Sequence, residues 1–83
     1  MIQSTYHSTY SGDPPEFSHS IEHLTPREQI IANIIYKLEL FRHREPSIER
    51  LREYSQMDKE EVVEILNGLK AQGIIEEVER PIV

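Results

Sequence analysis

Apolar residues repeat at helical spacing through the middle of the chain. The stripe consists of Ile30, Ile34, Leu38 and Phe41 at i, i+4, i+8 and i+11, widened by Ile31 and Ile35. This spacing predicts an amphipathic helix of about four turns that buries the stripe. The helix is expected to begin at Thr25, because a proline and then a glutamate follow it at the positions of a capping box. It is expected to end before Pro46, since the residue preceding a proline avoids the α conformation.

Two further helices are predicted after Pro46. Ser47 is placed to cap a short helix, whose inward positions are Ile48, Leu51 and Tyr54. After a break at 55–57, Asp58 caps a third helix that continues to about Gln72. The inward positions of this third helix are Val62, Ile65, Leu66 and Leu69.

The two ends of the chain differ from the helical middle. Gly73 is expected in the left-handed conformation that ends a helix. Residues 74–83 read as a strand, in which Pro81 permits only an edge position or a break. Residues 1–22 are rich in Ser, Thr and Tyr and have few large apolar positions, so we expect a disordered tail there. Residues 23–83 are expected to form the one domain.

Composition narrows the class of protein. A chain of 83 residues holds a single domain. It has no cysteine, which excludes disulfides and thiolate metal sites. Nine Lys and Arg against fifteen Asp and Glu give a net charge of −6, which does not favour nucleic acid as a partner. No signal peptide or membrane span is apparent, so a cytoplasmic protein without a membrane partner is expected.

Motifs of enzymes and cofactor sites are missing from the sequence. His19 and His23 have the i, i+4 spacing of two metal ligands, but no third ligand is close in sequence. No glycine-rich loop precedes a helix, and no serine lies in a nucleophile-elbow context. We therefore expect neither catalysis nor a metal or other cofactor.

Residues 48–75 resemble the helix-turn-helix of the winged-helix superfamily. Apolar anchors stand at Ile48, Leu51, Met57 and Val62, and the third helix leads into a strand after Gly73. With the first helix included, the resemblance covers residues 25–79. It implies an α+β, mostly helical fold: a three-helix winged-helix-like domain with a short C-terminal β element.

The chain departs from the winged-helix pattern at three points. Arg52 follows Leu51 where a small residue is usual, and Gln56 stands at a turn position that usually holds glycine. The segment after Gly73 is also short for a wing. The β element is either a single strand, pairing near Pro46, or a stunted hairpin that turns near residues 79–80.

The resemblance implies double-stranded DNA as the partner and a role as a small transcriptional or replication-associated regulator. The third helix would enter the groove through Lys59, Val63, Asn67 and Lys70. The DNA backbone would be held by Arg42, Arg44, Arg50 and Arg52. This function requires the four arginines to be exposed and unpaired on one face.

The acidity of the chain favours an alternative, a protein–protein interaction module that does not bind DNA. An acidic face of the third helix and the strand would bind a basic protein partner through Glu60, Glu64, Glu76 and Glu77. This function requires the four glutamates to form one contiguous negative face. In either case Tyr36 and Leu40, on the side of the first helix opposite the isoleucine stripe, form a candidate homodimer contact.

Overall fold

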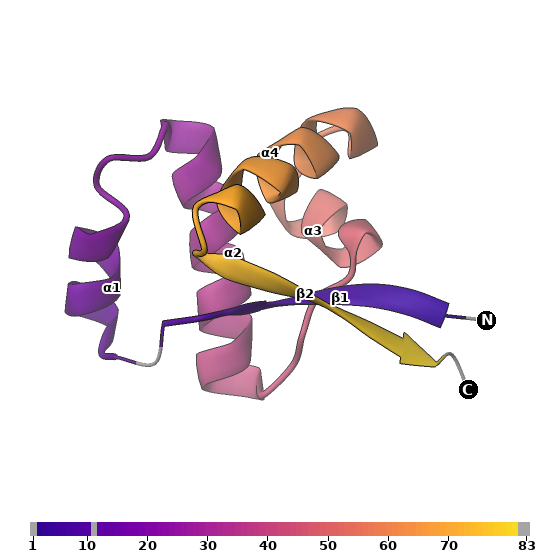
Figure 1. Ribbon diagram of the computed structural model, residues 1–83, viewed down its shortest axis with the longest axis horizontal. Helices are drawn as coiled ribbons and strands as arrows, with labels where there is room; N and C mark the ends of the chain where they lie inside the picture. Colours follow the sequence, from indigo (N-terminus) through magenta and orange to yellow (C-terminus); the bar gives the residue numbers. More distant parts are fainter. Residues whose placement is uncertain (1, 11, 82–83) are drawn as a thin grey trace.

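The first and last strands of the chain pair with each other. The computed structural model describes residues 2–10 and 12–81, and Figure 1 shows strand β1 (Ile2–Ser8) lying beside strand β2 (Ile75–Pro81). The pairing is antiparallel and places Ile2 opposite Pro81. The expected C-terminal strand is therefore present as a single strand with Pro81 at its end; residues 82–83 of the expectation lie outside the described residues.

The other edge of β1 meets residues 46–47, which come directly before the helix Ile48–Ser55. Thr5 forms an isolated bridge with Ser47, and the Tyr6 N–H donates a hydrogen bond to the Pro46 carbonyl at 3.0 Å. β1 thus lies between β2 and residues 46–47. The chain near Pro46, which one of the two expected alternatives gave as partner of the C-terminal strand, instead pairs with β1.

Four helices complete the described part of the chain, which is a small, mostly helical α+β domain. They are α1 (Pro14–Ser20), α2 (Pro26–Arg42), α3 (Ile48–Ser55) and α4 (Lys59–Ala71). In Figure 1, α1 lies on one flank of α2, whereas α3 and α4 lie toward its other side.

Local signals place the helix ends where the sequence predicts them. The Thr25 N–H donates to Glu28 Oε1 at 3.0 Å and the Glu28 N–H donates to Thr25 Oγ1 at 3.3 Å, so the capping box is confirmed. Ser47 caps α3 by accepting from the Arg50 N–H. Gly73 and Gln56 both have left-handed backbone, with φ of +74° and +58°. Only Gly73 takes this conformation without steric cost.

The expectation of a disordered tail over residues 1–22 is wrong for the residues described. β1 uses backbone hydrogen bonds to a strand at the far end of the chain, which sequence composition does not reveal. Phe17 of α1 is fully buried, and Ile21 and Leu24 are buried beside it in the core. A few well-placed apolar side chains therefore anchor a segment whose overall composition is polar.

The buried face of α2 is rotated from the predicted stripe. Ile31 and Ile35 are fully buried as expected, but Ile30 is 45% exposed and Phe41 is 70% exposed. Ala32 and Tyr36 are buried in their place. The reason is the N-terminal segment, which packs on α2. It covers a side of the helix that the sequence pattern predicts to be exposed to solvent.

The other helices follow their patterns more closely. All four predicted inward positions of α4 are buried, as is Leu51 of α3. Tyr54, expected inward on α3, is instead 48% exposed. Within residues 2–10 and 12–81, no helix has both the length and the apolar character needed to span a bilayer.

Candidate nucleic-acid interface

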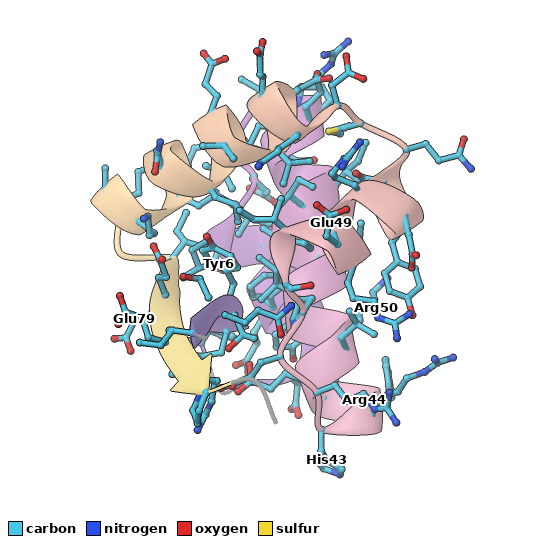
Figure 2. All side chains as sticks on the ribbon, turned by 90° about the vertical axis from the view of Figure 1, so that its right-hand side faces the viewer. Tyr6, His43, Arg44, Glu49, Arg50 and Glu79 are labelled. Carbon is cyan, nitrogen blue, oxygen red and sulfur yellow. The ribbon has the colours of Figure 1, made fainter. Side chains whose placement is uncertain are left out.

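Arginines gather around one hollow where α2 ends and α3 begins. The hollow has a volume of about 550 Å³ and is bounded by α2, α3 and the two strands. The arginines that line it are Arg42, Arg44, Arg50 and Arg80. We call this site the basic hollow. Figure 2 shows Arg44 and Arg50 on the same side of the molecule, with His43 close to Arg44 at the end of α2.

Two of these arginines have ion-pair partners among the described residues, and two have none there. Arg80 donates to Glu45 Oε1 from Nε at 3.0 Å and from a terminal nitrogen at 2.8 Å. Arg50 pairs with Glu53 at 3.3 Å, and both of these side chains are exposed. Within residues 2–10 and 12–81, neither Arg42 nor Arg44 forms an ion pair. The hollow therefore carries positive charge that the described chain does not neutralise.

Glu45 is the one carboxylate among the described residues that line the basic hollow. Besides Arg80, its Oε1 accepts a hydrogen bond from Thr5 Oγ1 at 3.3 Å. An anion entering the hollow would compete with this carboxylate for Arg80, because a guanidinium binds phosphate and carboxylate oxygens in the same geometry.

Three of the four arginines expected at the DNA backbone meet in the basic hollow, and Arg52 does not. Because Arg50 and Arg52 also pair with glutamates, the expectation of four unpaired arginines on one face is wrong. Arg52 pairs with Glu49 at 3.1 Å, outside the hollow. Arg50 and Arg52 are two residues apart on one helix and so point in different directions. The fourth arginine that lines the hollow is Arg80. The sequence held no signal for Arg80, because its position depends on the pairing of β2 with β1.

The groove-reading residues expected on α4 lie apart from the basic hollow. Lys59, Val63 and Asn67 line a separate hollow of about 540 Å³ together with Glu60 and Glu64. No described residue lines both hollows. The exposed face of α4 therefore carries the acidic residues beside the expected base contacts.

The Lys70 side chain forms an ion pair within the molecule, so it is not free on the surface of α4. Its Nζ donates to Glu77 Oε1 of β2 at 2.7 Å, and Ser4 Oγ of β1 donates to Glu77 Oε2 at 2.7 Å. These two hydrogen bonds lower the pKa of Glu77, and the bond to Glu77 raises the pKa of Lys70. The three side chains tie α4 to both strands.

The four glutamates of the alternative interface do not share one face. Glu60 and Glu64 lie together on α4, as described above. Glu76 and Glu77 are neighbours in β2, where successive side chains point to opposite faces. Glu76 pairs with His7 at 3.1 Å, whereas Glu77 points toward Lys70.

Tyr36 is not available for the expected dimer contact. It is 4% exposed, and its hydroxyl donates to the Gly12 carbonyl. Burial also raises the pKa of its phenol. The residues before α2, which the sequence did not predict to fold, cover this side of the helix. Leu40 remains 41% exposed beside them.

The two histidines with metal-ligand spacing have other partners. His19 Nδ1 lies 3.0 Å from Glu22 Oε1, and His23 Nε2 lies 3.1 Å from Gln72 Oε1. In the part of the chain that the structure describes, no three His, Asp or Glu side chains gather in the manner of a metal site.

Comparison with known proteins gives no family for this chain. No protein-family model, curated protein or solved structure matches it.

Proposed function

We propose that this protein binds DNA and that the basic hollow contacts the DNA phosphates. The observation that carries the proposal is the convergence of four arginines on one hollow in a chain of net charge −6. Phosphate neutralisation supplies nearly all of the non-specific affinity of proteins for DNA and a large share of the specific affinity. Arg42 and Arg44, which lack internal partners among the described residues, are the first candidates for these contacts.

The order of elements supports a winged-helix-like version of this function. Three helices, α2, α3 and α4, lead into strand β2, as in the superfamily that residues 25–79 resemble. β1, from the opposite end of the chain, pairs with β2 where a wing would supply a returning strand. We propose that α4 contributes base contacts through Lys59 and Asn67, and that the protein serves as a regulator of transcription or replication.

A titration of labelled duplex DNA tests the proposal. Fluorescence anisotropy is measured at low salt for the wild type, the Arg42→Ala/Arg44→Ala variant and an Arg52→Ala control. Arg52 is exposed on α3 and lies outside the basic hollow. We expect the double variant to bind about tenfold or more weakly and the control to bind as the wild type does. Equal binding by all three proteins would contradict the proposal.

The acidic surface of α4 favours a second candidate function, an interaction module for a basic protein partner. Glu60 and Glu64 flank Val63 at one hollow, and neither forms an ion pair among the described residues. The same titration, repeated with a single-stranded probe, separates the two functions. A wild type that binds neither probe even at low salt leaves the interaction module as the remaining candidate.

A further inference from the structure

A second hollow opens beside the basic one, between the end of α2 and the end of α3. Its volume is about 240 Å³, and its lining is apolar apart from two cations. The lining residues are Ile34, Lys37, Leu38, Phe41, Arg42 and Tyr54. We call it the aromatic hollow. Leu38, Arg42 and Tyr54 line both hollows, so the two lie side by side.

Two aromatic rings stand exposed in this hollow. Phe41 is 70% exposed and Tyr54 is 48% exposed, and neither stacks on another ring in the described part of the chain. Single exposed apolar side chains are common on protein surfaces. A pair of exposed rings in one hollow, next to cations, is the arrangement on which unpaired bases stack.

The charges at the aromatic hollow favour an anionic occupant. Lys37 and Arg42 form no ion pair within residues 2–10 and 12–81, and no described carboxylate lines the hollow. A second copy of this chain docked on the same face would bring two basic surfaces together, because a two-fold interface uses the same patch on both copies. A strand of nucleic acid supplies both the negative charge and the flat apolar surfaces.

We propose that single-stranded DNA lies across the two hollows, with phosphates at the arginines and bases stacked on Phe41 and Tyr54. This inference rests on the proposed function for its phosphate contacts and goes further by naming the form of DNA. In a duplex the faces of the bases are already stacked on their neighbours and are closed to the rings of a protein. The rings therefore favour an unpaired strand, whereas the arginines alone do not distinguish the two forms.

The test compares two labelled probes of equal length, an oligothymidine of about 12 nucleotides and a mixed-sequence duplex. Anisotropy at low salt is measured for the wild type and for Phe41→Ala, Tyr54→Ala and Tyr54→Phe. Ile30→Ala is the matched control, because Ile30 is similarly exposed on α2 but lines neither hollow. All four substitutions are at exposed positions, and circular dichroism checks that each variant folds.

We expect the wild type to bind the single strand more tightly than the duplex. Each alanine variant should lose about tenfold in affinity for the single strand and little for the duplex, whereas Tyr54→Phe keeps its ring and should bind normally. The Ile30→Ala control should bind both probes as the wild type does.

Tyrosine fluorescence provides a second readout. The chain has four tyrosines and no tryptophan, and of the four only Tyr54 is exposed. Stacking of a base on Tyr54 should quench part of the emission, and Tyr54→Phe should remove that quenching while leaving the affinity unchanged. An affinity unchanged by the loss of either ring, or a quench that persists in Tyr54→Phe, would overturn the inference.

The remaining outcomes separate this inference from the function on which it rests. The wild type could bind both probes equally, with binding lost in Arg42→Ala/Arg44→Ala and kept in the ring variants. This result would overturn the single-strand inference and keep the proposed function. Failure to bind either probe at low salt would overturn both. Sedimentation that shows a dimer converted to monomer by Phe41→Ala would assign the aromatic hollow to a second copy of the chain and overturn the inference.

Discussion

Phe17 lies flat against Tyr36, with ring centroids 4.0 Å apart and ring planes 5° from parallel. The stack joins α1 to α2, and the Tyr36 hydroxyl adds a hydrogen bond to the carbonyl of Gly12. Tyr10 completes the cluster, with its ring centroid 5.7 Å from that of Phe17. The polar N-terminal segment is therefore attached to the core by aromatic side chains.

Replacing Phe17 with Ala should destabilise the whole domain. Phe17 is fully buried, and deleting a buried phenylalanine costs about 3–5 kcal/mol. Urea denaturation followed by circular dichroism measures the change. Ser18→Ala, one residue along on the exposed side of α1, is the control and should change stability little. A midpoint unchanged by Phe17→Ala would mean that α1 contributes nothing to the fold.

Replacing Gln56 with Gly should stabilise the domain by about 1 kcal/mol, because a residue with a Cβ is strained in the left-handed region. Gln56 ends α3 at φ +58°. Thermal denaturation measures the effect. Gln72 ends α4 with ordinary right-handed backbone, so Gln72→Gly should produce no gain. A lower melting temperature for Gln56→Gly would show that the Gln56 side chain contributes more than its strain costs.

The Lys70–Glu77 pair should make stability depend on pH in two windows. The pKa of Glu77 is lowered from 4.5, so its contribution is complete above that pH and is lost as the pH falls through the lowered value. The pKa of Lys70 is raised from 10.5, so its contribution is complete below that pH and is lost as the pH rises through the raised value. Melting temperatures of the wild type and Glu77→Gln, measured across both ranges, should differ at neutral pH and converge at the extremes.

Glu79→Gln is the matched control for this pH dependence. Glu79 is exposed on the same strand and forms no ion pair among the described residues. The variant should follow the wild-type profile in acid. A Glu77→Gln profile parallel to that of the wild type at every pH would show that the pair does not couple protonation to folding.

Removing the negative charge of Glu45 should strengthen DNA binding. Glu45 neutralises Arg80 within the basic hollow, and Glu45→Gln leaves that arginine for a phosphate. The pair is partly exposed, so the gain in affinity should be modest, about threefold at low salt. Glu49→Gln, which frees Arg52 outside the hollow, is the control and should raise affinity less. A weaker Glu45→Gln complex would mean that Glu45 holds the hollow in its binding shape.

Local patterns in the sequence were sufficient for the helices that depend on local chemistry. The capping box at Thr25 and Glu28 starts α2, and Gly73 terminates the last helix with positive φ. The buried positions of α4 follow its apolar period, since one side of that helix faces the core throughout. Such features depend on residues within a turn or two of one another.

The N-terminal half of the fold depends on distant partners and could not be predicted in this way. Tyr6 is buried in β1, a strand whose pairing partner β2 comes from the far end of the chain. Isoleucines occupy four positions on adjacent sides of α2, so the pattern does not say which side is buried. The same limit applies to the candidate site: Arg42, Arg44 and Arg50 are near neighbours along the chain, whereas Arg80 reaches them through the sheet.

The salt dependence of DNA binding tests the central claim most directly. Each phosphate contact adds about 0.9 to the slope of log affinity against log salt concentration for duplex DNA. Replacing Arg42 and Arg44 with Ala should therefore reduce the slope of the wild type by about 2. Arg52→Ala should leave the slope unchanged. Parallel lines for the wild type and the double variant would contradict the assignment of phosphate binding to the basic hollow.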